Sequence, residues 1–286
     1  MAEFIKITAA IKKYVYPGST VALEGFTHLI PFAAGHEIIR QQISDLTLVR
    51  MTPDLLYDQM IGMGLVRKLV FSWGGNPGVG SLHRFRDAIE HAWPRGLEIE
   101  EFTHAAMASA YEAGAAGLPL AVLRGHRGTD LPRVNASIKF LVCPFTGEEL
   151  ACVPSIRPDV TIIHAQKADR LGNVMIEGIV GVQKEAALAA SVTVVTVEEV
   201  VMEFGERSRN AVVLPSWTIS AIAHCPGGAR PSYAHGHYSR DNSFYQRWDS
   251  ISRDRDVFLA WMNDNVLNSD GAGSVGKPSD AREVLS

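Results

Sequence analysis

Apolar positions along this chain follow two spacings that alternate from the N-terminus onward. Short runs that are apolar nearly throughout, as buried strands are, cover residues 19–26, 46–51, 68–73, 97–102, 158–165, 192–201 and 210–215. Segments whose apolar residues recur every three or four positions, as in helices, cover residues 4–15, 32–43, 54–64, 81–93 and 181–190. Strands that alternate with helices predict an α/β fold, with an open, mostly parallel sheet flanked by helices.

The pattern changes near the C-terminus. From Asn268 the chain reads "NSDGAGSVGKPSD", which is rich in Gly and Ser and poor in apolar residues. We therefore expect one α/β domain over residues 1–267 and a flexible tail over residues 268–286. With 286 residues, 47 % of them hydrophobic, the chain can bury a substantial core.

Glycines and polar residues gather where four predicted strands end. Ligands of open parallel sheets bind at the carboxyl ends of strands, where the loops meet. The stretches concerned are Glu24-Gly25-Phe26-Thr27-His28, Trp73-Gly74-Gly75-Asn76-Pro77-Gly78, Glu101-Phe102-Thr103-His104 and His164-Ala165-Gln166. Together they predict half of a binding cleft.

Each of these stretches also has a simpler interpretation. The glycines of "GGNPGVG" would let backbone N–H groups approach an anion or a thioester oxygen, but a plain loop explains them equally well. No Gly-Lys-Ser/Thr follows, so this is not a nucleotide-binding Walker loop. Glu24 and His28 are two titratable groups on either side of a glycine, which favours a pocket, although a Glu at a strand end is often simply solvated.

Residues 100–119 predict a strand, an N-cap at Thr103 and a helix of small residues that Gly114 and Gly117 end. The small residues suggest close packing against another backbone or subunit. His104 falls in the first turn of this helix, as a functional group or as an ordinary surface histidine. Ala105 is small for its place. If the chain had lost an acid or base by substitution, we would expect the loss there.

The stretch "HAQKADRLGN" predicts a strand followed by a tight hairpin. Asp169 can accept backbone N–H bonds across the turn, and Gly172-Asn173 suit positive φ. His164 and Gln166 share one face of the strand as it ends, and either a pocket or the core explains them. The later segment from residue 224 to 248 is aromatic and rich in His and Gly, so it suits the cover of a groove or a contact with a partner chain.

Composition narrows the class of protein. The net charge is −4 with basic residues scattered, so we expect no nucleic-acid partner. No apolar run reaches the ~20 residues that cross a bilayer, and no signal peptide is visible, so we expect no membrane association. The three cysteines read as buried thiols in a reducing cytoplasm. The pair in "HGH" at residues 235–237 lacks a third ligand, so we expect no metal.

Three motifs in order carry a family resemblance: "PGSTVALEGF", "CPFTGEELACVPSIRPDVTIIHAQKADRLGNVMIEG" and "CPGGARPS" followed by "YSRDNSFYQRW". From about residue 4 to 266 the chain resembles the class I CoA-transferase superfamily, in particular alpha subunits of the glutaconate CoA-transferase-like branch. The resemblance implies an active site at the interface with a beta subunit, an α2β2 heterotetramer, an acyl-CoA substrate and no separate cofactor. It also implies a nucleophilic glutamate in a Ser-Glu-Asn-Gly motif on the beta subunit.

One departure from the family pattern directs the functional prediction. The alpha chain of the family has a Gly-Gly-Phe loop, and here Glu24 takes the place of the first glycine. A carboxylate where an oxyanion is held speaks against plain transfer. The pattern looks most like the actinobacterial branch of cholesterol ring-cleaving hydrolase alpha subunits.

That resemblance implies a hydrolase that opens a carbon–carbon ring bond in a cyclic β-keto acyl-CoA from the C and D rings of a steroid. Water activated by a base would add to the ring ketone, and the thioester would stabilise the resulting carbanion. His104, a group at the position of Ala105, and Glu24 would be catalytic. The substrate would be bound by Gly25, Phe26, Thr27, His28, Gly74, Gly75, Asn76, His164 and Gln166. The alternatives are a CoA-transferase with its glutamate on the beta subunit, and a non-catalytic acyl-CoA-binding scaffold.

Overall fold

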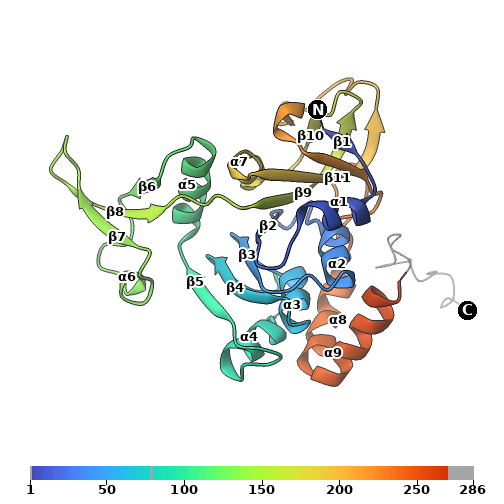
Figure 1. Ribbon diagram of the computed structural model, residues 1–286, viewed down its shortest axis with the longest axis horizontal. Coiled ribbons are helices and arrows are strands. Elements are labelled where there is room, and N and C mark those ends of the chain that lie inside the picture. The colour runs from blue at the N-terminus through green and yellow to red at the C-terminus, as the bar shows by residue number, and fades with distance from the viewer. Residues whose placement is uncertain (1, 78–79, 270–286) are drawn as a thin grey trace, which may run out of the picture.

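A ten-stranded, mostly parallel sheet organises the part of the chain that the computed structural model describes, residues 2–77 and 80–269 (Figure 1). Its main path runs β1-β13-β11-β9-β2-β3-β4-β5, and β10 and β12 add antiparallel pairs beside β9. These strands are β1 (Glu3–Phe4), β2 (Thr20–Glu24), β3 (Leu46–Arg50), β4 (Val66–Phe71), β5 (Glu98–Glu101), β9 (Val160–Asp169), β10 (Val174–Ile176), β11 (Val192–Val201), β12 (Val212–Leu214) and β13 (Ala221–His224). The predicted fold class is confirmed.

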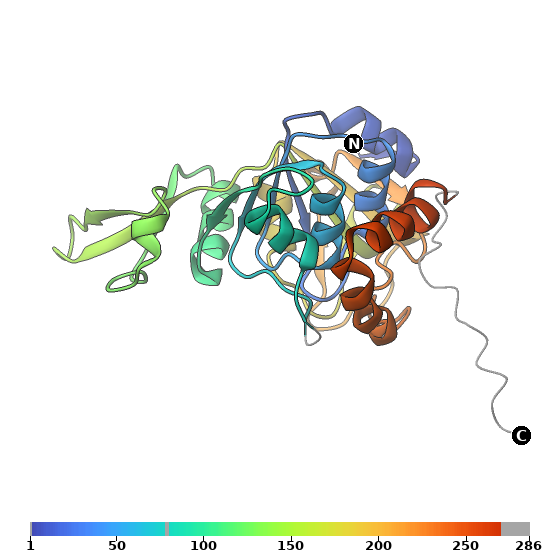
Figure 2. The same ribbon diagram turned by 90° about the horizontal axis from the view of Figure 1, so that it is seen from below.

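Helices cover both faces of the sheet (Figures 1 and 2). They are α1 (Ile7–Tyr14), α2 (Phe32–Arg40), α3 (Leu55–Gly62), α4 (His83–Glu90), α5 (His104–Ala115), α6 (Leu131–Val134), α7 (Gln183–Ala189), α8 (Asn242–Arg253) and α9 (Arg255–Met262), with the short helices η1 (Ser216–Thr218) and η2 (Asn263–Leu267). Because side chains alternate along a strand, Leu23 and Leu48 pack with α2, α3, α8 and α9, whereas Ala22 and Val49 pack with α5 and α7.

An arm over residues 118–157 projects from the body of the molecule (Figure 2). It consists of a three-stranded antiparallel sheet, β6 (Leu120–Leu123), β8 (Glu149–Pro154) and β7 (Lys139–Val142), together with α6. The arm was not predicted from the sequence. Large apolar side chains are exposed on it, Phe145 at 95 % and Val142 at 66 %.

The predicted hairpin after β9 is confirmed in its main features. Asp169 anchors the turn, because its Oδ1 accepts the N–H groups of Leu171 and Asn173, each at 2.9 Å. Gly172 has φ +88°, as expected, but Asn173 does not adopt a positive φ. The strand itself is longer than predicted, because β9 continues to Asp169 through its pairing with β11.

Two other local predictions need correction. The first predicted helix begins only at Ile7, since Glu3 and Phe4 pair with β13 as β1. The aromatic segment near residues 224–248 is not a loop throughout, because α8 begins at Asn242.

The small-residue helix α5 is capped as predicted, by the Thr103 hydroxyl, which accepts the N–H of Ala106. Gly114 does not end it, since α5 runs to Ala115. A Cβ on Gly114 would lie only 2.1 Å from the carbonyl oxygen of Ile156. The small residue is therefore required by close contact with a backbone, which is the backbone of this chain.

The remaining organisational predictions stand differently. The predicted tail lies outside the described residues, apart from Asn268 and Ser269. All three cysteines are free, and each is partly exposed rather than buried as expected. Within residues 2–77 and 80–269, none of the helices combines the length and the apolar character that crossing a bilayer requires.

Candidate active site

The carboxyl ends of β2, β3 and β4 lie side by side and form a cavity of about 200 Å³ between their loops. Parallel pairing brings these ends to one edge of the sheet, as the sequence predicted. The cavity is lined by Phe26, Thr27, Arg50, Thr52, Asp54, Trp73 and Pro77. Of these, only Phe26 and Thr27 were among the predicted site residues.

Glu24, the last residue of β2, lies beneath this cavity and does not line it. Its side chain is 2 % exposed, and Oε1 accepts the hydroxyl of Tyr111 at 2.9 Å and the N–H of Met51 at 3.2 Å. Burial raises the pKa of the Glu24 carboxyl, and the positive charge of nearby Arg50 only partly offsets this rise. The predicted catalytic role of Glu24 stays a prediction, and its carboxylate faces the protein interior.

Arg50, the last residue of β3, is the buried cation of the site and was missed by the sequence reasoning. Nη1 donates to Asp54 at 2.9 Å, and Nη2 donates to the carbonyl oxygen of Gly25 at 2.8 Å. Its Nε has no hydrogen-bond partner among the described residues. The available signal was a charged residue that closes an otherwise apolar strand, with an aspartate four positions later.

The loop after β2 is held in an unusual backbone shape. Thr27 and Leu29 have φ values of 55° and 53°, which non-glycine residues seldom adopt. A Cβ on Gly25 would lie 2.8–2.9 Å from backbone atoms of residues 28–30, so the loop folds tightly over that position. Leu29 N–H donates to the carbonyl of Tyr233, which fixes the far end of the loop. The surrounding structure thus stabilises strained residues beside the cavity.

The loop after β4 forms the opposite wall. Gly75 lies under the indole of Trp73, where a Cβ would come within 2.6 Å of the ring, and its N–H donates to the carbonyl of Pro53. Gly74 and Asn76 belong to the same loop, but neither lines the cavity. The Asn76 side chain is turned inward, where Nδ2 donates to the carbonyl of Tyr245 at 2.8 Å.

His104 and Ala105 open α5, next to the end of β4. His104 is exposed, and its Nδ1 lies 3.2 Å from the Ser72 hydroxyl, which donates to the carbonyl of Met51. Ala105 is also exposed and carries no titratable group. The structure places His104 at the same edge of the sheet as the cavity, without making it part of the lining.

The other predicted residues form a separate buried cluster beyond the loop after β2. Nε2 of His164, inside β9, pairs with Glu198 at 2.7 Å, and Nδ1 lies 2.8 Å from the Thr196 hydroxyl. His28 contacts the carbonyl of Ile179 and the N–H of His235 through its two ring nitrogens. Burial lowers the pKa of His28.

Gln166 ties the backbone of Glu177 through both its amide groups. All of these polar groups have partners within the chain, so the core interpretation explains them fully. Their predicted role in substrate binding stays a prediction.

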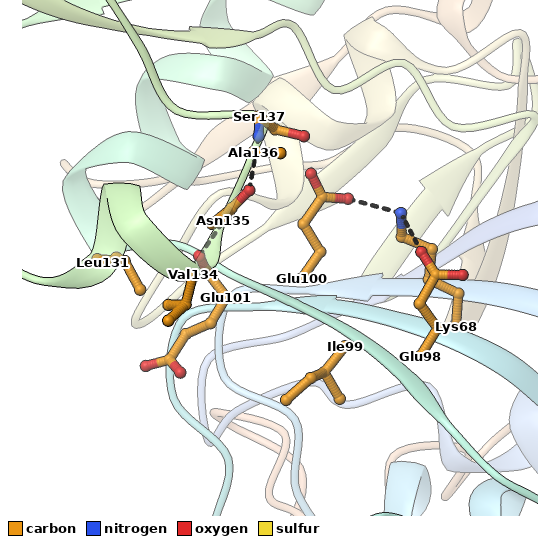
Figure 3. A pocket seen from close by; sticks show the side chains of 10 residues that line it. All are labelled: Lys68, Glu98, Ile99, Glu100, Glu101, Leu131, Val134, Asn135, Ala136 and Ser137. Carbon is orange, nitrogen blue, oxygen red and sulfur yellow. Dashed lines mark hydrogen bonds and ion pairs between the residues drawn. The ribbon is translucent and has the colours of Figure 1, made fainter.

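A larger hollow of about 260 Å³ lies elsewhere, between the edge strand β5 and the arm (Figure 3). Lys68 stands between Glu98 and Glu100 and pairs with both, at 3.0 and 2.8 Å. Asn135 donates to the carbonyl of Glu101 at 2.7 Å. The charges there neutralise one another and no strand ends converge, so the smaller cavity is the better candidate for chemistry.

Comparison with known proteins decides the family. The family model for coenzyme A transferase matches residues 4–224. The chain belongs to the coenzyme A transferase family. It is 64 % identical over 266 residues, 93 % of its own length, to a subunit of the 3-oxoadipate CoA-transferase of Pseudomonas knackmussii, and it covers 94 % of that relative.

A second relative links sequence and structure. The chain is 32 % identical, over 94 % of its length and 89 % of the relative, to a subunit of the glutaconate CoA-transferase of Acidaminococcus fermentans. The crystal structure of glutaconate CoA-transferase from that organism superposes with a TM-score of 0.88 at 30 % identity and covers 94 % of this chain and 90 % of that one. These relatives are subunits of two-subunit transferases, so membership of a hetero-oligomer is consistent with the comparison.

The comparison overturns the hydrolase prediction. A cholesterol ring-cleaving hydrolase subunit of Mycobacterium tuberculosis is only 25 % identical, over 81 % of this chain and 82 % of that one. The much higher identity to a CoA-transferase subunit contradicts ring hydrolysis, lyase chemistry and steroid catabolism, and it favours the transferase alternative. The argument from Glu24 failed because a carboxylate at a loop's first position need not face the ligand, and here it faces Tyr111.

Proposed function

We propose that this chain is the alpha subunit of a CoA-transferase that moves CoA between an acyl-CoA and 3-oxoadipate or a closely similar 3-oxo dicarboxylic acid. The observation that carries the proposal is the 64 % identity to the 3-oxoadipate CoA-transferase subunit, which extends over 93 % of this chain. An identity of that extent takes in nearly the whole α/β domain and not a single motif.

The chemistry of transfer suits the walls of the cavity. One thioester and one carboxylate are exchanged for another thioester and another carboxylate, so the net reaction consumes no water and moves no electrons. Phe26 and Trp73 give the cavity an aromatic lining. An apolar wall that keeps water away favours transfer, because an activated thioester is otherwise lost to hydrolysis.

A partner subunit completes the proposed site. We expect a beta subunit of the same family to bring the nucleophilic carboxylate to the cavity, in an α2β2 assembly. The arm offers exposed apolar side chains, Phe145 and Val142 among them, of the kind that protein interfaces cover. Transfer through a partner's carboxylate needs no activated water, so His104 and Ala105 would border the acyl-CoA without deprotonating water.

The test is an assay of the co-expressed alpha and beta chains. Purified enzyme is mixed with short acyl-CoA donors, with and without 3-oxoadipate, in heavy-oxygen water, and products are followed by mass. We expect 3-oxoadipyl-CoA to form at the expense of the donor thioester, with no solvent oxygen in the released acid. A 3-oxo monocarboxylic acid serves as the control acceptor.

Other outcomes would contradict the proposal. Loss of the thioester at the same rate without any acceptor, with solvent oxygen in the acid, would indicate a hydrolase. Thermal stabilisation of the pair by acyl-CoA without turnover would indicate the non-catalytic scaffold.

A further inference from the structure

Two hydrogen bonds tie the ends of β2 and β3 to each other in opposite directions. Arg50, at the end of β3, donates Nη2 to the carbonyl oxygen of Gly25 at 2.8 Å. Met51, the next residue, donates its N–H to Oε1 of Glu24 at 3.2 Å, at the end of β2. We call these two bonds the reciprocal tie.

The reciprocal tie acts from both faces of the sheet. Glu24 shares its face with Ala22, which packs with α5, whereas Arg50 shares its face with Leu48, which packs with α3. A bond on each face resists rotation of the two loops about the sheet edge, which a single bond would permit.

Each end of the reciprocal tie is anchored to a helix. Tyr111 in α5 donates its hydroxyl to Glu24 at 2.9 Å. Asp54 accepts from Arg50 at 2.9 Å, and the same carboxylate caps α3 by accepting the N–H of Leu56. Glu24, Arg50 and Asp54 are all at most 2 % exposed, so these bonds are shielded from competing water.

We propose that Glu24 and Arg50 are positioning residues for CoA transfer, which hold the loop from Gly25 to Leu29 in the shape that walls the cavity. Neither exchanges a proton with the substrate. The strained φ values of Thr27 and Leu29 support this, because such residues persist only where the surroundings fix them. The inference rests on the proposed function for its kinetic test.

The first experiment compares Glu24→Gln with Glu24→Ala in the co-expressed enzyme. A glutamine oxygen can still accept from Met51 and Tyr111, so we expect kcat within about threefold of the unchanged enzyme. The alanine removes both bonds and frees the loop, and misplacement of about 1 Å at a reacting centre costs on the order of 100-fold in rate. We expect a fall in kcat of more than about thirtyfold with KM changed far less. Equal loss in both variants would overturn the proposal, because it would mean that the carboxyl itself reacts.

The second experiment uses Arg50→Lys against a matched control, Arg84→Lys. Arg84 is also a buried arginine that pairs with an aspartate, Asp87, and donates to a carbonyl, that of Arg253, but it lies in α4 away from the cavity. Lysine cannot make both bonds at either place. We expect both variants to lower Tm, and only the change at Arg50 to lower kcat by about tenfold or more. Equal kcat values in the two variants would overturn the proposal.

The third measurement does not depend on turnover. Hydrogen exchange of the peptide that covers residues 25–31, in the full-length protein, reports the loop directly. We expect exchange at least about tenfold faster in Glu24→Ala than in the unchanged protein, and unchanged in Glu24→Gln, because only the alanine opens the reciprocal tie. Unchanged exchange in the alanine variant would overturn the inference. If the enzyme proves inactive toward 3-oxoadipate, the proposed function fails while this readout still decides the role of Glu24.

Discussion

Two buried polar networks in this protein use similar bonds to different ends. The strand-end network joins Glu24 to Met51 and Tyr111, and Arg50 to Asp54 and Gly25. The helix-layer network joins Asp58 in α3 to the N–H of Phe85 and the indole of Trp248, both at 2.9 Å. In each network a buried carboxylate accepts one backbone N–H and one side-chain donor.

The difference lies in what each network touches. Asp58 and Trp248 are fully buried where α3, α4 and α8 pack together, so their bonds fix the packing of helices. Arg50 and Asp54 line a cavity, so the bonds of the strand-end network fix the shape of a surface that a ligand can reach. The same chemistry thus stabilises the fold in one place and positions a binding loop in the other.

The largest expected effect is on the helix-layer network. Trp248→Ala should lower the free energy of unfolding by about 3–5 kcal/mol, because it removes a large buried side chain and leaves Asp58 without its donor. Urea denaturation measures the change. Phe145→Ala, on the exposed arm, is the control and should stay within about 0.5 kcal/mol in the isolated chain. Equal losses in the two variants would contradict the buried role of Trp248.

The next effect depends on pH. Burial raises the pKa of Asp58 from its ordinary value of 3.8 to about 6. Between these values the unfolded chain loses the proton while the folded chain keeps it, so stability falls as pH rises. A pKa difference of this size corresponds to ~3 kcal/mol, fully developed above about pH 6 and absent below about pH 4.

Asp58→Asn should remove this pH-dependent part and leave a constant offset from its altered hydrogen bonds. The difference in free energy of unfolding between Asp58→Asn and the unchanged chain, measured by urea denaturation from about pH 4 to about pH 7, should therefore change by about 3 kcal/mol in favour of the variant. A difference that is flat over this range would show that Asp58 does not titrate as inferred.

A pair of glycines sharpens the comparison between cavity and core. Gly25→Ala places a Cβ 2.8–2.9 Å from backbone atoms of the loop, so the loop must move, and we expect kcat to fall about 100-fold. Gly62→Ala, in α3, meets the Phe258 ring at 2.5 Å and should cost about 1–3 kcal/mol of stability with kcat nearly unchanged. Steady-state kinetics and urea denaturation of both variants separate the two effects. The comparison fails if the change at Gly62 affects kcat as strongly as the change at Gly25.

The smallest effect concerns the neighbour of His104. Ser72→Ala removes the bond to the carbonyl of Met51 and the contact with the imidazole, at a cost of about 1 kcal/mol. Because His104 is exposed and does not line the cavity, we expect kcat to fall by less than about threefold. A loss beyond about thirtyfold would instead place His104 in the chemistry.

Much of the fold was predictable because it depends on local periodicity. Seven strands and the helices between them follow from the spacing of apolar residues, and the turn at Asp169 and the cap at Thr103 follow from local hydrogen bonding. The arm was not predicted because its short strands are only four to six residues long and lie partly exposed, so they lack a clear pattern. The strand β13 was missed for the same reason of length.

The sequence alone determined that polar loops follow the strands and that parallel pairing brings those loops to one edge of the sheet. Only the tertiary structure decided which side chains face the cavity there. Side-chain direction depends on the face of the strand and on the partner that waits on that face: Glu24 meets Tyr111 from α5, and Arg50 meets Asp54 at the start of α3. Those partners lie 87 and 4 residues away along the chain, and no local spacing encodes the longer of these contacts.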